Sequence, residues 1–133
     1  MLKGRCHCGA VSYEMSSQTI HQALCHCEDC RRCAGAPMVA WAMVKEDDLK
    51  VTGTTKSYAS SEHGRRHFCE TCGTGLFYAN EAVFPGMIDI QTATLDDPGQ
   101  IVPGAQIQTA ERIPWMTTID QLPQFDRYPG PPG

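Results

Sequence analysis

The chain has 133 residues, a length typical of one compact domain. Hydrophobic residues make up 41% of it and charged residues 20%, a composition that excludes a largely disordered or collagen-like chain. Fifteen acidic residues against eleven basic ones give a formal net charge of -4, which argues against nucleic acid as a partner.

Short runs with the composition of β-strands follow one another through the first two thirds of the chain. Turn-forming glycines and the pair Pro85 and Gly86 separate these runs, and no helical periodicity is sustained for three turns. Strands are predicted over residues 10–15, 20–24, 38–44, 56–59, 66–68, 76–78 and 87–94. The charged stretch 45–49 is predicted to be a solvated turn or a single helical turn. The fold class expected from these elements is mainly β.

Prolines interrupt the last third of the chain and prevent long regular elements there; they stand at positions 98, 103, 114, 123 and 129. The apolar anchors that remain are Ile101, Ile107, Ile113, Trp115, Ile119 and Phe125. We expect this irregular Pro-rich third to wrap over a sheet. A single domain is predicted over residues 1–128, followed by a Pro/Gly tail over residues 129–133.

Whether the eight cysteines form disulfides or bind metal depends on the compartment that the sequence favours. The longest strongly apolar stretch, residues 38–44, is far shorter than the ~20 residues that cross a bilayer, so no membrane partner is expected. The first residues lack the apolar segment of a secretory signal, which favours a cytoplasmic location. Because that compartment keeps thiols reduced, we expect metal binding rather than four disulfides.

The first candidate metal site combines two cysteine pairs. In an extended segment, residues two apart point to one side, so Cys6 and Cys8 present their sulfurs together. Cys69 and Cys72, followed by Gly73, have the spacing of a metal-binding knuckle. Two pairs make a closed tetrahedral zinc site with a structural role.

The second candidate site is the group Cys25, Cys27 and Cys30. Three protein ligands with an open fourth position are typical of catalytic zinc, and an open position suits a thiol and its carbonyl partner. Two alternatives remain: Cys33 or His26 closes the site as a second structural zinc, or the group holds an iron–sulfur cluster.

Other residues are weaker candidates. His7 and His26 lie between ligand cysteines, where supporting or surface roles are favoured over metal binding. Glu28 and Asp29 are candidates for proton transfer, and Arg31 and Arg32 for holding a substrate carboxylate, against the simpler interpretation of solvated surface charge. Trp41 and Trp115 are interpreted as packing residues.

The chain resembles the glutathione-dependent formaldehyde-activating enzyme family, which includes the relatives of centromere protein V. The resemblance rests on residues 4–11, 25–37, 63–73, 94–98, 114–115 and 122–125. It implies a small mainly β fold of packed antiparallel sheets. It also implies two zinc ions per chain, with Cys6, Cys8, Cys69 and Cys72 as structural ligands and Cys25, Cys27 and Cys30 as catalytic ligands.

The expected function follows from the resemblance together with the open site. The resemblance implies a carbon-sulfur lyase that adds the thiol of glutathione to formaldehyde, giving S-hydroxymethylglutathione. We therefore expect a small thiol and an aldehyde as partners. The alternative is a non-catalytic zinc scaffold with two closed metal sites that binds another macromolecule.

Overall fold

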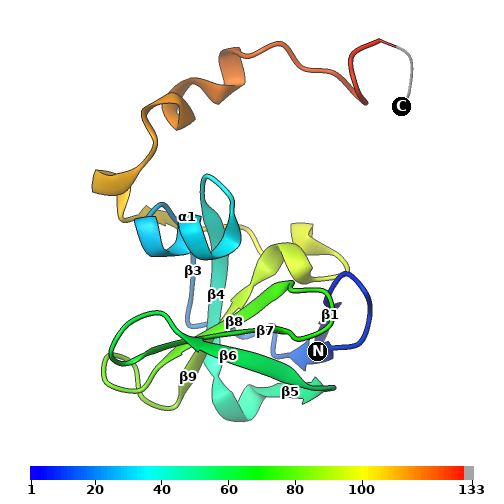
Figure 1. The fold of residues 1–133 in the computed structure, drawn as a ribbon, viewed down its shortest axis with the longest axis vertical. Coiled ribbons are helices and arrows are strands. Elements are labelled where there is room, and N and C mark those ends of the chain that lie inside the picture. The colour runs from blue at the N-terminus through cyan, green and yellow to red at the C-terminus, as the bar shows by residue number, and fades with distance from the viewer. Residues whose placement is uncertain (131–133) are drawn as a thin grey trace.

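The computed structural model describes residues 1–130, which form two β-sheets and one short α-helix (Figure 1). The smaller sheet has the strand order β1-β2-β5, with the bounds Leu2–Arg5, Ser12–Met15 and Leu49–Thr52. The larger sheet has the order β10-β3-β4-β9-β8-β7-β6. In chain order its strands are β3 His21–Cys25, β4 Val39–Lys45, β6 Thr55–Ala59, β7 Gly64–Cys69, β8 Gly75–Asn80, β9 Met87–Gln91 and β10 Ala105–Ile107.

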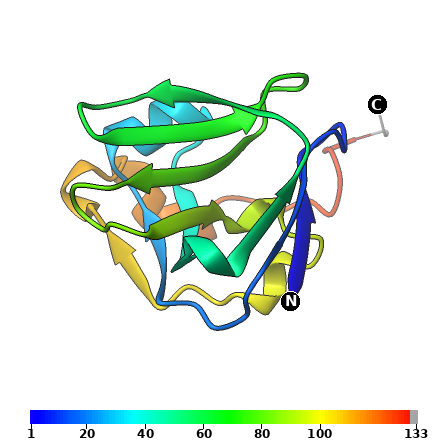
Figure 2. The same ribbon diagram turned by 90° about the horizontal axis from the view of Figure 1, so that it is seen from below.

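The main hydrophobic core lies between the two sheets (Figure 2). Successive side chains of a strand point to opposite faces, so Ala42 and Val44 of β4 and Ile88 and Ile90 of β9 turn toward the core, where they pack with Tyr13 of β2 and its neighbours. The alternate residues of the same strands face the other side of the large sheet. That second face carries the polar site described below.

The mainly β fold is confirmed, and each of the seven predicted runs overlaps a strand of the structure. The charged stretch contains the 3-10 turn η1 (Glu46–Asp48), as expected. Three short strands were not predicted: β1, β5 and β10. Strand β10 also pairs parallel with β3, so the larger sheet is mixed rather than wholly antiparallel.

The α-helix α1 (Glu28–Ala34) was missed because seven residues make only two turns, too few for a periodic apolar pattern. Two local features mark the start and the end of this helix. Cys27 is the N-cap, with its Sγ accepting a hydrogen bond from the amide of Cys30 at 3.3 Å. Gly35 ends the helix in the left-handed conformation that glycine adopts without strain.

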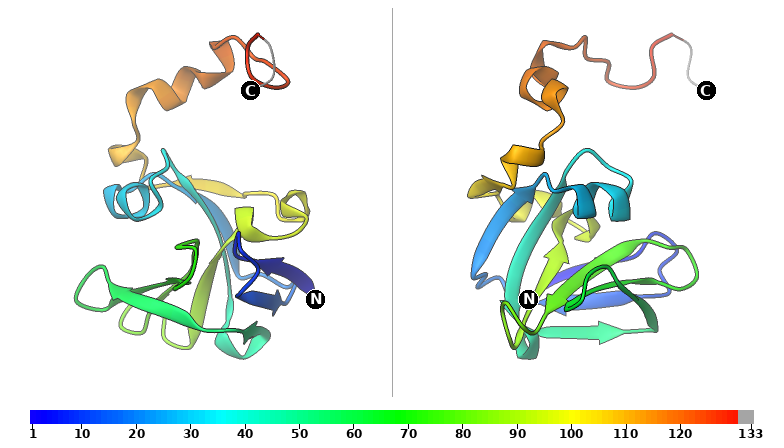
Figure 3. Two further views of the ribbon diagram at one scale, coloured as in Figure 1. Left: turned by 45° about the vertical axis from the view of Figure 1, so that its right-hand side comes forward. Right: turned by 60° about the vertical axis from the view of Figure 1, so that its left-hand side comes forward.

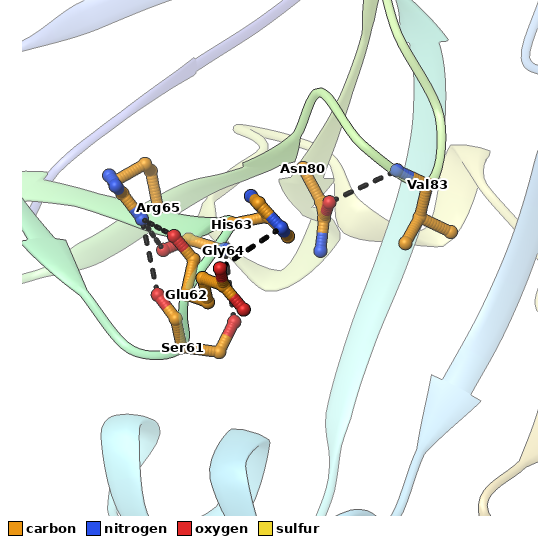
Figure 4. A network of polar contacts seen from close by, with 7 residues as sticks. All are labelled: Ser61, Glu62, His63, Gly64, Arg65, Asn80 and Val83. Carbon is orange, nitrogen blue, oxygen red and sulfur yellow. Dashed lines mark hydrogen bonds and ion pairs between the residues drawn. The ribbon is translucent and has the colours of Figure 1, made fainter.

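The hairpin between β6 and β7 is closed by its own polar groups (Figure 4). Arg65 Nη1 donates to the carbonyl oxygens of Ser61 and Glu62, both at 3.2 Å, and the Gly64 amide donates to Ser61 Oγ at 3.0 Å. These contacts hold the register that pairs Tyr58 with Arg66. The hairpin thereby places Arg66, which belongs to the candidate site.

The expectation that the last third wraps over a sheet is correct only in its first part. Ile101 packs against the core, and β10 joins the sheet edge. Beyond these, residues 112–128, called the arm below, extend away from the sheets (Figure 1 and Figure 3). The arm contains the 3-10 segment η5 (Pro114–Gln121), and its anchors Trp115 and Phe125 are 53% and 61% exposed. These two anchors therefore do not pack on the sheet as expected.

The predicted boundary of the domain at residue 128 stays a prediction. Of the expected tail over residues 129–133, the last three lie outside the described residues, and Pro129 and Gly130 are exposed. Among residues 1–130, no helix is both long and apolar enough to span a bilayer.

Candidate metal centres and an adjoining cavity

Four cysteine sulfurs meet at one end of the core. Cys6 and Cys8 follow β1 of the small sheet, whereas Cys69 ends β7 of the large sheet and Cys72 lies in the turn after it. The Sγ atoms of Cys6 and Cys8 are 3.6 Å apart, those of Cys8 and Cys69 are 3.8 Å apart, and all four lie within 4.8 Å of one another. A tetrahedral metal with bonds of about 2.3 Å to sulfur places its ligands about 3.8 Å apart, so this donor set fits zinc.

Backbone amides support the same sulfurs. The amide of Val11 donates to Cys6 Sγ at 3.3 Å, and the amides of Thr71 and Cys72 donate to Cys69 Sγ at 3.4 Å. Thr74 Oγ1, 3.1 Å from Cys72 Sγ, is the main cause that lowers the pKa of Cys72 to about 5. A thiolate is therefore stabilised at Cys72, and the group joins the two sheets through residues far apart in the chain.

Three further sulfurs gather on the other face of the large sheet. Cys25 ends β3, Cys27 caps α1, and Cys30 lies within the helix; their Sγ atoms all lie within 4.8 Å of one another. The guanidinium of Arg66 approaches Cys30 Sγ through Nη2 at 3.7 Å and Nη1 at 3.8 Å. The hydrogen bond from Cys25 and the charge of Arg66 lower the pKa of Cys30 to about 5, against the burial that raises it. A thiolate is thus stabilised within this group as well.

Neither residue proposed as an additional ligand joins the three sulfurs. Cys33 is exposed one turn after Cys30, beside a separate hollow that Trp41 and Tyr58 also line. His26 is fully buried, but its Nε2 atom is 2.9 Å from Oε1 of Gln106. Among the described residues, the group that can hold a metal therefore has three sulfur ligands.

Strand β10 and the residues after it fasten the cysteine-bearing segment, which sequence reasoning missed. Besides the contact of His26 with Gln106, the His26 amide donates to the carbonyl oxygen of Ile107 at 3.1 Å. The Glu28 amide donates to Oε1 of Glu111 at 3.0 Å, so a carboxylate lies at the start of α1. A three-residue strand without a strong pattern gave no signal for this pairing.

A cavity of about 460 Å³ opens beside the three cysteines, a volume within the usual range of small-molecule sites. Tyr78 lies at the centre of an aromatic wall, with its ring 6.1 Å from that of Trp41 and 6.0 Å from that of Phe84. Arg66 lies over the Tyr78 ring at 4.8 Å. The lining also includes four carboxylate residues, Glu28, Asp29, Asp89 and Glu111. Thiolates, aromatic rings and acidic groups thus share one concave site.

The structure shows the position and contacts of the weaker candidates from the sequence. Glu28 pairs with Arg32 at 2.9 Å near the cavity, and Arg31 donates to the carbonyl oxygen of His26. Trp41 is buried in the cavity wall as a packing residue. His7 is exposed, and its amide donates to Thr74 Oγ1. Trp115 is exposed on the arm, where it lines a hollow beside the end of α1 together with Ile113, so it packs at a rim rather than in the core.

The cavity residues that sequence reasoning missed include Arg66, Tyr78 and Asp89. They lie on strands β7, β8 and β9, far along the chain from the cysteines that they face. Arg66 and Tyr78 fall within predicted strands as ordinary strand residues. The only local signal was Asp89, a charged residue inside an otherwise apolar run.

Comparison with known proteins gives a family match and related sequences. The model of the glutathione-dependent formaldehyde-activating enzyme family matches residues 1–111. An uncharacterized lyase of Schizosaccharomyces pombe is 31% identical over 77 residues, which are 58% of this chain and 56% of the relative. A putative glutathione-dependent formaldehyde-activating enzyme of Halomonas elongata is 34% identical over 86 residues, covering 58% of this chain and 55% of the relative. The chain thus spans about half the length of these curated relatives.

A crystal structure of a Rhodobacter sphaeroides protein has the same fold. It superposes with a TM-score of 0.62 at 24% sequence identity, covering 79% of this chain and 99% of that one. At this identity the likeness concerns the fold alone. The family match ends at residue 111, before the arm, so the matched region contains both cysteine groups and the cavity.

Proposed function

The chain belongs to the glutathione-dependent formaldehyde-activating enzyme family, and from that premise we propose that it is a carbon-sulfur lyase that joins a small thiol to an aldehyde. Glutathione is the proposed thiol, formaldehyde the aldehyde and S-hydroxymethylglutathione the product. The observation that carries the proposal is the group of three cysteine sulfurs at the wall of an open cavity. A closed site with four protein ligands would leave no position for a substrate.

Zinc is the proposed metal at both cysteine groups, because soft thiolate ligands in these numbers favour it. Cys6, Cys8, Cys69 and Cys72 would hold one ion, and Cys25, Cys27 and Cys30 the other. At the second site, zinc supplies the chemistry that the reaction needs, since it lowers the pKa of a bound thiol and polarises a carbonyl group.

The residues of the chain prepare the site in three ways. Arg66 places a positive charge beside Cys30, which opposes the negative charge that collects when several thiolates come together. The Cys30 amide holds Cys27 Sγ in place, and the contact of His26 with Gln106 fastens the segment between the ligands. Trp41, Tyr78 and Phe84 form a hydrophobic wall that limits the access of water. Because the ligands are thiolates, the proposal requires a reducing location such as the cytoplasm.

The proposed reaction is tested by measuring how fast glutathione and formaldehyde exchange with S-hydroxymethylglutathione, with NMR exchange spectroscopy on the zinc-loaded protein. We expect exchange faster than the uncatalysed reaction, and elemental mass spectrometry should find two zinc ions per chain with negligible iron. Mild chelation should remove the ion of the three-cysteine site first and the rate acceleration with it, because three protein ligands hold less firmly than four.

Two outcomes would overturn this proposal. Iron with labile sulfide in the purified protein would replace zinc chemistry with an iron–sulfur cluster. Fully retained zinc without glutathione binding or accelerated exchange would favour the alternative of a non-catalytic zinc scaffold. S-methylglutathione, which lacks the thiol, serves as the matched ligand that is expected not to bind the metal site.

Replacing Cys33 with serine tests whether three ligands suffice. Because Cys33 lies outside the group of three sulfurs, Cys33→Ser should keep both zinc ions and bind glutathione with the affinity of the unmodified protein. Elemental analysis and isothermal titration with glutathione measure both quantities. Loss of one zinc ion, or a clear gain in glutathione affinity, would identify Cys33 as a fourth ligand that the thiol must displace.

A further inference from the structure

One row of residues crosses the face of the large sheet that carries the cavity. The strand register pairs His21 with Met43, Met43 with Asp89, Asp89 with Tyr78, and Tyr78 with Arg66. All five residues line the cavity beside the three cysteines. Because paired residues of neighbouring strands point to the same face, the row is a consequence of the sheet register. It places Asp89 between His21 on one side and Tyr78 with Arg66 on the other.

The carboxyl group of Asp89 is buried without a hydrogen-bond partner for one of its oxygens. The residue is 7% exposed, and its Oδ1 atom is shielded from solvent with no donor within reach. The Nε2 atom of His21 is 3.9 Å from Oδ1, which is too far for a hydrogen bond. Burying a carboxyl oxygen without a hydrogen-bond partner costs folding free energy. Packing alone therefore does not explain why a carboxyl group lies at this position.

The titratable and charged groups that line the cavity with Asp89 come from several elements, and besides Cys25, Cys27 and Tyr78 they are as follows. Strand β3 contributes His21, β7 contributes Arg66, and α1 contributes Glu28, Asp29 and the Cys30 thiolate, while Glu111 follows β10. Arg66 is already engaged by Cys30 and by Ser60 Oγ, which accepts from its Nε atom at 3.1 Å. Burial first and the negative charge of Cys30 second raise the pKa of Asp89 from 3.8 to about 7. A carboxyl group that titrates near neutral pH suits a general acid and base.

We propose that Asp89 transfers the proton in the thiol addition, an inference that rests on the proposed function. Its carboxylate accepts the proton of the thiol as the S–H bond breaks. The sulfur forms a bond to the carbonyl carbon, and the C=O double bond becomes a single bond. The protonated Asp89 then donates to the oxygen, which completes the hydroxymethyl group and returns the carboxylate to its initial state. The overall step moves one proton from sulfur to oxygen, so no oxidant or reductant takes part.

Asp89→Asn tests this role because it keeps the shape of the side chain and removes its ability to transfer a proton. We expect the accelerated exchange between glutathione and its S-hydroxymethyl adduct to fall about 100-fold or more. Zinc content and glutathione affinity should stay unchanged, and the rate should lose the pH dependence centred near neutral pH. Asp89→Glu should recover part of the rate. Glu14→Gln, which removes a negative charge on the small sheet, is the matched control and should leave the rate unchanged.

Two readouts separate this role from a structural one. The pKa of Asp89 is raised in the folded state, so the group contributes stability that is present below its unfolded-state pKa and is lost as the pH rises through about 7. Above neutral pH, Asp89→Asn should therefore raise the Tm, whereas loss of a structural contact would lower it. In the unmodified protein, carbon-13 NMR of the carboxyl carbon should show a titration near neutral pH, a measurement that needs no variant.

The possible failures are distinguishable. If the zinc-loaded unmodified protein accelerates exchange and Asp89→Asn does so equally well, the role of Asp89 is wrong and the proposed function stands. A titration of Asp89 in the ordinary acidic range also contradicts the role. If the unmodified protein shows no acceleration, the proposed function fails, and the role of Asp89 fails with it.

Discussion

Cys69→Ser is expected to leave the protein unfolded or largely insoluble, the largest effect on stability that we anticipate. Cys69 is buried at the junction of the two sheets, and its sulfur lies 3.8 Å from that of Cys8, 61 residues earlier in the chain. A structural zinc ion contributes about 10–16 kcal/mol of apparent folding free energy, which equals or exceeds the ~5–15 kcal/mol that stabilises a typical domain. Removing one of its four ligands therefore threatens the whole fold.

Soluble yield, thermal unfolding and zinc content of purified Cys69→Ser measure this effect. Cys27→Ser is the matched control, since it makes the same chemical change in the other cysteine group. Serine is a favourable N-cap residue, so it preserves the capping role that Cys27 plays at the start of α1. An equal or greater loss of stability in Cys27→Ser would reverse the assignment of the structural and catalytic sites.

Cys27→Ser itself is expected to have the largest effect on activity. The variant should fold with one zinc ion per chain, and its exchange of glutathione and formaldehyde should return to the uncatalysed rate. Two sulfurs remain at the site, Cys25 and Cys30, which are too few to hold zinc in the geometry of a three-ligand catalytic site. The change lies beside the cavity, outside the core between the sheets, which explains why the fold should survive.

NMR exchange spectroscopy and elemental analysis on the same preparation test this prediction. Cys33→Ser makes an identical substitution later on the same helix, where the sulfur lies outside the group, and controls for the loss of any thiol from α1. If Cys27→Ser retains accelerated exchange with one zinc ion, the reaction does not depend on the three-cysteine site. A second hollow, which Cys6, His7 and Thr74 line beside the four-cysteine group, would then be the place to search for it.

The cysteine groups and most strands are local features, which is why they are recognisable in the sequence. A C-x-C or C-x-x-C segment brings two sulfurs together within a few residues, whatever the rest of the chain does. The continuous apolar run of β4 and the apolar residues of β9 likewise mark these segments as buried strands. In the structure, Cys6 and Cys8 lie together with Cys69 and Cys72. The second group consists of Cys25, Cys27 and Cys30, and both groups agree with the sequence analysis.

The remaining features depend on how distant segments pair, which local patterns do not encode. The sheet register alone places Asp89 beside Tyr78 and in line with Arg66, although these residues come from three strands. Strand β10 pairs with β3 although about 80 residues separate them, and this pairing brings Gln106 to His26. The apolar residues of the arm indicated a wrap, yet Trp115, Ile119 and Phe125 are exposed in the structure, because a local apolar pattern does not fix the surface against which it packs. The sequence by itself therefore determined which cysteines group together as possible metal ligands and the mainly β fold, whereas tertiary pairing decided which side chains surround the open site.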